Sequence, residues 1–537
     1  MAERRFRQGG RWAAPLLLLL LTSFAQFHQL TRDLRFLPDE AFFMTFARGA
    51  AVNGDWLLPG PLDKPPLSIY ISALSMVAVA VTADEDGVLH LDAGVGEFAG
   101  RLPNVYLAIL LTALLMRLAW RMHRDRWAAV IAGALAAASP YLLAYGASAL
   151  TDMSLLFWAA AALYLALAGR WGLSGLALGL AFWSKQQAAL FVPLLVMILL
   201  ARGGRREDWL RLGLPAIILG AALLIWDGAR PEASIFAQAA VNNAPETWLA
   251  APALWLRRFW DWLGRLLWLL GPPLVTGVLL LGAAFVSARR WGGRTSRNRA
   301  LTVERALLLY IVGYLGALML MPFNLYDRYL LLILPPLIML VAGQLARLTR
   351  AGARATGIGL SDSELGLRRR NIQAGDSQSR PYTATYLLLV AVRCYSFSKL
   401  NWRSLGLAAL LAAGGLWSWQ TGWMVGGDRR AFDGVDALAD HVNSKPVASV
   451  IYDPWLGWEL GYYLGQWHDK RTVHYPTPAT LVAGALALDE IGDRYLVAPA
   501  DQAHEEWLAA LDAAGFRVAV DYARDRFIVY RLGIPPK

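Results

Sequence analysis

Two adjacent carboxylates, Asp39 and Glu40, stand in the stretch FLPDEAFF, directly after the first long apolar run of the chain. Pro38 before them suits the first turn of a helix, where carboxylates also gain from the helix dipole. Carboxylates in such a place can simply face water, or one of them can accept a proton from a hydroxyl group. Which of these holds depends on the other charged groups that reach the same place.

Other charged residues interrupt apolar segments farther along the chain. Asp63 and Lys64 precede two prolines in LDKPPLSIY, and Asp152 follows Thr151, a candidate helix cap, in ALTDMSLLFW. Lys185 separates two apolar segments in AFWSKQQAALF. Each residue has a simple structural explanation on its own, such as a lysine that reaches the lipid headgroups. Their joint meaning depends on whether they share one side of a membrane.

A last group stands in FNLYDRYLLLILPP, with Tyr326, Arg328 and Tyr329 at a helix end. If these helix ends meet, acids from two loops and cations from three come together. This combination suits transfer from a lipid-linked phosphate, because cations stabilise the charge on a departing phosphate and an aspartate can accept a hydroxyl proton. The candidate residues for these roles are Lys64, Lys185 and Arg328 for the phosphate and Asp39 for the proton.

The composition indicates a polytopic helical membrane protein. The chain has 537 residues, 57% of them hydrophobic, and apolar runs of about 18 to 22 residues recur, each long enough to cross a bilayer. The single cysteine, Cys394, excludes an intramolecular disulfide framework and a multi-cysteine metal site. The formal net charge of +11 is better explained by arginine-rich cytoplasmic loops than by nucleic-acid binding.

The apolar runs predict about eleven spans, and the arginines orient them with the N-terminus inside. The predicted spans are 11–30, 101–120, 127–146, 152–169, 171–184, 188–201, 209–227, 264–287, 303–322, 329–348 and 405–424. The apolar stretch 66–82 fits the charge pattern only as an interfacial helix. This threading places the charged groups described above on the outer face.

The chain divides into four predicted parts. They are a transmembrane catalytic module at 1–350, a polar cytoplasmic loop with an uncertain apolar segment at 351–404, a last helix at 405–427, and an extracytoplasmic α/β domain at 428–537. The last part contains the strand-like runs ASVIYD, RYLVAP, FRVAVD and RFIVYRL. If the short basic segment 386–397 also crossed the membrane, this domain would lie inside.

The ordered motifs PDEAFF, GDWLLPG, DKPPL, EFAGRLPN, TDMSLLFW, SKQQ and DRYLLLILPP, over roughly residues 10 to 350, resemble those of the GT-C glycosyltransferases. Within this group the sequence looks similar to the bacterial relatives of protein O-mannosyltransferases and of lipid A aminoarabinose transferases. The resemblance implies transfer of a sugar from a polyprenyl or dolichyl phosphate, with inversion, on the non-cytoplasmic face.

The resemblance also assigns roles to residues. Asp39 aligns with an essential aspartate of the first outer loop, Asp152 with a second acid, and Lys64 and Lys185 with phosphate-contacting lysines. The candidate catalytic residues are therefore Asp39, Asp152 and Glu40, and the further pocket candidates are Asp63, Tyr326 and Tyr329. The sequence departs from the family at Phe42 and Phe43, where Arg and Tyr are common, and Asp63 replaces a usual Glu.

Several alternatives stay open at this point. Asp84–Asp86 with His90 could imitate the acid-x-acid metal motif of pyrophosphate-dependent oligosaccharyltransferases, so a divalent metal is possible, although a monophosphate donor requires no cofactor. A glycan ligase, a polymerase or a transporter would also place charges in the membrane. The expected partners are a polyprenyl-phosphate sugar, membrane lipids and a lipid, protein or polysaccharide acceptor, without nucleic acid. The expected location is a bacterial inner (plasma) membrane.

Overall fold

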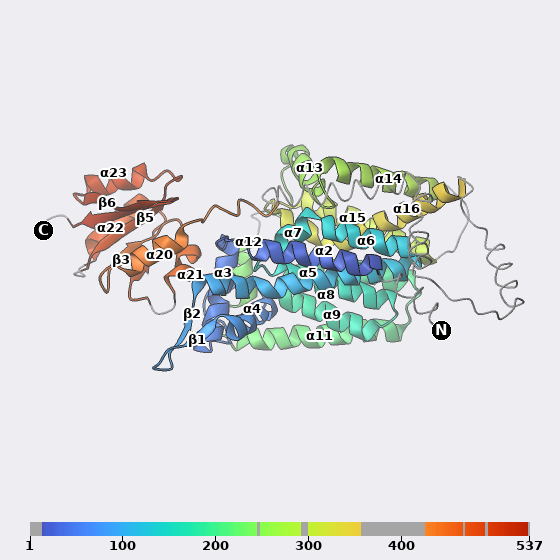
Figure 1. The fold of residues 1–537 in the computed structure, drawn as a ribbon, viewed down its shortest axis with the longest axis horizontal. Helices are drawn as coiled ribbons and strands as arrows, with labels where there is room; N and C mark the ends of the chain where they lie inside the picture. The colour runs from blue at the N-terminus through green and yellow to red at the C-terminus, as the bar shows by residue number, and fades with distance from the viewer. Residues whose placement is uncertain are drawn as a thin grey trace, which may run out of the picture.

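The computed structural model describes residues 13–243, 247–291, 299–355, 425–465, 468–488 and 492–534. An elongated bundle of helices carries a small sheet domain at one end (Figure 1). The helices of the bundle are α2 (Ala13–Leu30), α5 (Ala93–His123), α6 (Arg126–Ala138), α7 (Pro140–Gly146), α8 (Asp152–Leu167), α9 (Trp171–Ser184), α10 (Val192–Ala201), α11 (Arg206–Gly228), α14 (Pro273–Trp291), α15 (Arg299–Leu320) and α16 (Leu334–Ala355).

Five of the described helices are long and apolar enough to cross a membrane, or six if the bent pair α6 and α7 forms one span. The protein is therefore a multi-pass membrane protein. Several other predicted spans are apolar helices of 10–17 residues, so the predicted count of about eleven stays a prediction. The predicted span 405–424 and the segment 386–397 lie outside the described residues.

Prolines break two of the predicted spans. The predicted span 127–146 bends by 59° between α6 and α7, where Pro140 begins the second helix. The predicted span 264–287 is wrong at its start, because helix α13 (Pro252–Leu266) ends there and α14 begins only at Pro273. A proline interrupts the helical hydrogen-bond ladder but is well suited to a first helical turn, which explains both breaks.

The segment between α2 and α5 folds at one end of the bundle. It contains α3 (Pro38–Arg48), the π-helical turn η1 (Gly49–Asn53), α4 (Leu67–Val79) and a hairpin of β1 (Val81–Ala83) and β2 (Leu89–Leu91). Helix α3 begins at Pro38, as the sequence predicts, and places Asp39 and Glu40 in its first turn. Helix α4 has 13 residues and is too short to span a bilayer alone.

The C-terminal domain is a five-stranded sheet with helices, as the sequence predicts in outline. The strands β3 (Val450–Tyr452), β4 (Arg471–Val473), β5 (Arg494–Pro499), β6 (Arg517–Arg524) and β7 (Phe527–Gly533) follow the order β4-β3-β5-β7-β6. Strand β3 pairs in parallel with β4 and β5, whereas β7 pairs antiparallel with β5 and β6. The helices are α20 (Val435–Asn443), α21 (Trp458–Leu464), α22 (Pro478–Ala487) and α23 (Glu505–Ala513).

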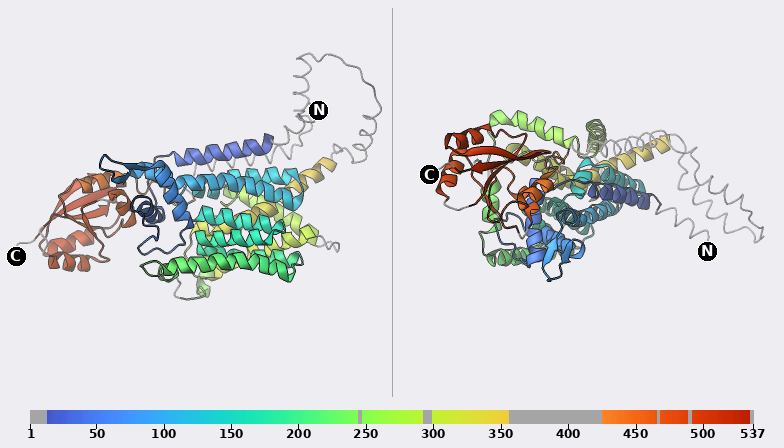
Figure 2. Two further views of the ribbon diagram at one scale, coloured as in Figure 1. Left: turned by 90° about the horizontal axis from the view of Figure 1, so that it is seen from below. Right: turned by 60° about the vertical axis from the view of Figure 1, so that its left-hand side comes forward.

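The C-terminal domain docks on the end of the bundle that carries α3 and α4 (Figure 2). Helices α20 and α21 face the bundle, and α21 packs on α3. The Tyr463 hydroxyl accepts a hydrogen bond of 2.8 Å from the backbone N–H of Phe36, and Arg48 donates to the carbonyl of Tyr462. These contacts hold the domain close to the start of α3.

Candidate active site

A pocket of about 270 Å³ brings charged side chains from distant parts of the chain together, and we call it the charged pocket. Its charged residues are Asp39, Asp63, Lys64, Asp152, Lys185 and Arg328. They come from the first turn of α3, the loop before α4, the first turn of α8, the end of α9 and the 3-10 helix η3 (Asp327–Ile333). The sequence singled out all six, so the structure unites residues up to 289 positions apart.

Each cation of the charged pocket is paired with one acid. The three ion pairs are Arg328–Asp39 at 2.5 Å, Lys64–Asp63 at 2.5 Å and Lys185–Asp152 at 2.7 Å. The side chain of Asp39 remains 48% exposed, whereas those of Asp152 and Lys185 are buried. Asp39 is thus the carboxylate of the pocket that an incoming molecule reaches most easily.

The two candidate tyrosines lie beside the cations. Tyr326 lines the charged pocket, and its ring centre lies 4.8 Å from the guanidinium carbon of Arg328. The ring centre of Tyr329 lies 5.9 Å from the Lys185 ammonium nitrogen. Such contacts orient the cations through the negative face of each ring.

Lys185 occupies the break between α9 and the 3-10 helix η2 (Gln186–Phe191), where its backbone is extended. Burial lowers the pKa of the Lys185 ammonium group to about 8, although the charge of Asp152 opposes this shift. The charges of Arg328 and Lys64 act in the same direction as burial. The positive charge of Lys185 is therefore sensitive to pH in the mildly alkaline range.

Three buried polar atoms at the charged pocket have no hydrogen-bond partner among the described residues. They are Thr151 Oγ1, Asp63 Oδ1 and Arg328 Nε. The expectation that Thr151 caps α8 through its side chain is wrong, because the hydroxyl makes no capping hydrogen bond. Unpartnered buried polar atoms are costly, so their presence in one pocket fits a polar ligand that satisfies them.

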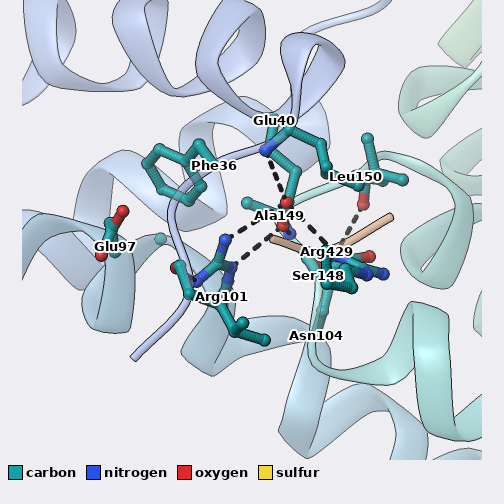
Figure 3. A network of polar contacts seen from close by, with 12 residues as sticks. Phe36, Glu40, Glu97, Arg101, Asn104, Ser148, Ala149, Leu150 and Arg429 are labelled. Atoms are coloured by element: carbon teal, nitrogen blue, oxygen red, sulfur yellow. Dashed lines mark hydrogen bonds and ion pairs between the residues drawn. The ribbon is translucent and has the colours of Figure 1, made fainter. Parts of the chain in front are cut away.

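Glu40 does not line the charged pocket, in contrast to the catalytic role considered from the sequence, and lies in a network of polar contacts (Figure 3). Its carboxylate is fully buried and accepts hydrogen bonds from Arg101 at 3.0 and 3.2 Å and from the Ala149 N–H at 2.8 Å. Burial would raise the pKa of Glu40, but the charges of Arg101 and Arg429 outweigh it and keep the pKa below its usual range. This geometry indicates that Glu40 stabilises the fold and does not take part directly in the reaction.

The buried network around Glu40 positions two elements of the charged pocket. Arg101 in α5 also donates to the carbonyls of Leu34 and Arg35, just before α3. Asn104, one turn along α5, donates to the carbonyls of Ser148 at 2.6 Å and Leu150 at 2.7 Å, just before α8 (Figure 3). Helix α5 thus fixes the starts of both α3 and α8, and with them the catalytic candidates at positions 39 and 152.

Sequence reasoning missed the contributions of two distant segments. Asn243 at the end of α12 (Ile235–Asn243) lies 3.4 Å from an Asp63 oxygen, and Trp458 of the C-terminal domain lines the charged pocket. Glu459, next to Trp458, is buried, and burial together with the charges of Asp453 and Asp39 raises its pKa to about 8. No motif signals these residues, because only the folded chain brings them near Asp39.

A second cavity of about 860 Å³ shares Asp39, Tyr326 and Arg328 with the charged pocket. Its other walls include Trp260 of α13 and Trp268 just after it. Helix α13 exposes several large apolar side chains, namely Leu254, Trp255, Leu256, Phe259 and Trp260. An apolar outer face of this kind is typical of a helix at a membrane interface.

The possible metal motif, Asp84–Asp86 with His90, lies in the hairpin of β1 and β2, and two of its side chains contact each other. His90 Nε2 lies 2.9 Å from a carboxylate oxygen of Asp84. Within the described part of the chain, no group of three or more His, Cys, Asp or Glu side chains is arranged to hold a metal ion.

The chain matches known proteins over part of its length. A family model described as dolichyl-phosphate-mannose-protein mannosyltransferase matches residues 86–226. An undecaprenyl phosphate-alpha-4-amino-4-deoxy-L-arabinose arabinosyl transferase 2 from Proteus mirabilis is 29% identical over 200 residues, 34% of this chain and 34% of that protein. A similarly named transferase from Edwardsiella ictaluri is 25% identical over 369 residues, 62% of this chain and 59% of that protein. The chain thus spans about a third of the first of these relatives.

The fold extends over nearly the whole chain. The structure of ArnT from Cupriavidus metallidurans bound to undecaprenyl phosphate aligns with 97% of this chain and 98% of its own, with a TM-score of 0.61 and 18% identity. The apo oligosaccharyltransferase of Archaeoglobus fulgidus aligns with 98% of this chain and 74% of its own, with a TM-score of 0.52 and 12% identity. These comparisons confirm the resemblance and the GT-C fold class predicted from the sequence.

Proposed function

We propose that the protein is a glycosyltransferase that moves a sugar from a polyprenyl-phosphate donor to an acceptor hydroxyl. The observation that carries this proposal is the charged pocket itself, where three cations from three segments share one cavity with a half-exposed aspartate. Lys64, Lys185 and Arg328 suit the single phosphate of the donor, and the unpartnered Thr151 hydroxyl offers it a further hydrogen bond. The names of the curated relatives support the same donor class.

The reaction is a single displacement with inversion at the sugar carbon. Asp39 accepts the proton of the acceptor hydroxyl as its oxygen forms a bond to the anomeric carbon. The bond from that carbon to the phosphate oxygen breaks, and the polyprenyl phosphate leaves with the bonding electrons. Cations already fixed in the pocket stabilise the charge that develops on the departing phosphate.

Donor binding would also free Asp39, the proposed base, from its ion pair with Arg328. Arg328 holds the Asp39 carboxylate at 2.5 Å, so the guanidinium engages one oxygen of this carboxylate. An arriving phosphate competes for the same guanidinium, because a phosphate oxygen accepts the same bonds as a carboxylate oxygen. Asp39 is then free to accept a hydrogen bond from the acceptor hydroxyl.

The second cavity offers a path for the polyprenyl chain. It adjoins the charged pocket at Asp39 and Arg328 and borders the apolar outer face of α13. The donor lipid could therefore remain in the membrane while its phosphate reaches the cations. This arrangement requires no cofactor, since the basic side chains neutralise the phosphate.

The active site is assigned to the extracytoplasmic face of a bacterial inner membrane. Arg121 and Arg202 both donate to the carbonyl of Leu167, at the C-terminal ends of α5, α8 and α10. The charged pocket lies at the opposite ends of α5 and α8. Arginines gather on the cytoplasmic side of membrane proteins, so this bias supports an outer location for the pocket.

Donor consumption by the purified full-length protein in lipid nanodiscs tests the proposal. Polyprenyl-phosphate-linked pentoses and hexoses, together with matched pyrophosphate-linked sugars, are supplied with a bacterial envelope extract as the acceptor. We expect release of free polyprenyl phosphate from one of the monophosphate donors. Consumption of pyrophosphate donors alone would favour an oligosaccharyltransferase, and movement of a donor across the bilayer without its consumption would indicate a transporter.

A further inference from the structure

A third cavity, of about 860 Å³, opens between the segment that joins α2 to α5 and the C-terminal domain, and we call it the outer cleft. Phe46, Asn53 and Asp55 line it from one side, and Trp458 and His474 from the other. The segments that form it lie outside the helix bundle, where α3 meets α21 (Figure 1). The outer cleft thus exists only because the C-terminal domain is docked.

Trp458 forms a common wall of the outer cleft and the charged pocket. Its ring centre lies 4.9 Å from that of Phe42, which lines the charged pocket, and 5.7 Å from that of Phe46, which lines the outer cleft. The Trp458 residue keeps 38% of its surface exposed. A molecule bound in the outer cleft against this ring would therefore end beside the charged pocket that contains Asp39.

The lining of the outer cleft combines aromatic rings with hydrogen-bonding groups. Its polar side chains include Thr45, Asn53, Asp55, His468, Thr472 and His474. A sugar ring presents apolar C–H faces to aromatic side chains and hydroxyl groups to polar ones, so it matches such a lining. A lipid chain would offer no hydrogen bond to these polar groups, and strand β4 at the sheet edge pairs over only three residues, which offers little to a peptide strand.

The face of α21 toward the outer cleft is open. Gly461 lines the cleft within this helix, and a Cβ atom added there would meet no other atom within 4 Å. Gly461 is not among the residues with positive φ, so a larger residue fits its backbone. The space over Gly461 is therefore free for a ligand, and a side chain placed there would occupy it without disturbing the packing.

We propose that the outer cleft binds a carbohydrate acceptor, stacks it on Trp458 and presents its accepting group to Asp39. This inference rests on the proposed function and names the acceptor class of the same site. It also gives the C-terminal domain a direct part in acceptor choice, since Trp458 and Gly461 belong to that domain.

The test compares Gly461→Leu with Gly220→Leu in the full-length protein. Gly220 is a matched control, because it lies within a helix and a Cβ added there also meets no atom within 4 Å, but it lines none of the three cavities. A radiolabelled polyprenyl-phosphate sugar that the wild type consumes serves as the donor, and the envelope extract serves as the acceptor. Mass spectrometry of the labelled product identifies the residue that received the sugar.

We expect the label on a saccharide, in either a glycan or a glycolipid. Gly461→Leu should raise the KM for the acceptor extract at least about ten-fold, while the KM for the donor stays within about two-fold. Trp458→Ala should also raise the KM for the acceptor extract, and Trp458→Tyr should restore much of that loss by keeping an aromatic face.

Three outcomes would overturn the inference. Label on an amino-acid side chain or on a lipid without sugar would exclude the acceptor class. Equal acceptor KM values for Gly461→Leu and Gly220→Leu would exclude the outer cleft, while donor turnover would leave the proposed function intact. A wild type that consumes no donor with any extract would overturn the proposed function as well.

Discussion

At the scale of single residues, the charged pocket is a set of matched charges rather than a simple basic cluster. Three acids accompany three cations, and the acids hold the cations in place before any ligand arrives. Lys185 differs from the others because it is fully buried and its pKa is about 8. Under the proposed function, a phosphate that enters the pocket would replace a carboxylate as the partner of at least one cation.

Lys185 should set the alkaline limit of the reaction. As the pH rises through about 8, the ammonium group loses its proton and the phosphate loses a positive partner, so kcat/KM for the donor should fall. Lys185→Arg keeps a charge at high pH, and we expect its pH profile to lack this fall, although its maximal activity is lower. The measurement is donor turnover between pH 6 and 10.

Glu459 supplies the control for that experiment, because its pKa also lies near 8. Glu459→Gln has a neutral side chain at all pH values, and its donor turnover should still fall at alkaline pH. If the alkaline fall in donor turnover persists in Lys185→Arg but disappears in Glu459→Gln, then Glu459, and not Lys185, sets the alkaline limit.

Thr151 should act on the donor and not on stability. Its buried hydroxyl has no partner among the described residues, so Thr151→Val removes a group that gains little in the free protein. We expect an unchanged or slightly higher unfolding temperature and a KM for the donor about three- to ten-fold higher, the equivalent of one hydrogen bond. A lower unfolding temperature with an unchanged KM would show that the hydroxyl serves the fold instead.

At the scale of elements, helix α5 organises the site. Arg101 and Asn104 lie one turn apart and hold the residues before α3 and α8. Both residues belong to the motif EFAGRLPN, which the sequence marked as part of the family pattern without assigning a role. Arg101 and Asn104 of this motif therefore have a structural explanation in the buried network of Figure 3.

Neutralising Glu40 should lower the unfolding free energy more than neutralising its neighbour Asp39. Glu40→Gln leaves Arg101 without its buried carboxylate, and breaking such a pair costs about 3–5 kcal/mol of unfolding free energy. Asp39→Asn changes a pair whose carboxylate is half-exposed, although the Arg328 side chain is only 16% exposed, so a smaller loss of unfolding free energy is expected. Thermal unfolding of both variants in detergent measures the difference. Equal stability of the two would contradict the structural place given to Glu40.

At the scale of the whole molecule, the sequence predicted the fold class, the sheet domain and the six charged residues of the charged pocket. It succeeded because charges at the ends of apolar runs are easily seen, and these charges meet in one pocket at the end of the helix bundle. It could not separate Asp39 from Glu40, because neighbouring residues on a helix turn point in different directions and only packing shows which one is buried.

Contacts between distant segments could not be predicted from the sequence. Trp458 and Glu459 reach the site only through docking of the C-terminal domain, and no periodicity or motif records that docking. The break at residues 267–272 was missed because its apolar composition resembles that of the helices on either side. Prolines at positions 272 and 273 were the available signal.

The central claim is that one pocket, assembled from segments far apart in the chain, transfers the sugar through Asp39. Donor turnover by wild-type protein and Asp39→Asn in nanodiscs, with equal amounts of folded protein, tests it most directly. Loss of a positioned base lowers the rate by about two to four orders of magnitude, and donor binding should survive the substitution. Turnover by Asp39→Asn close to that of the wild type would contradict the account.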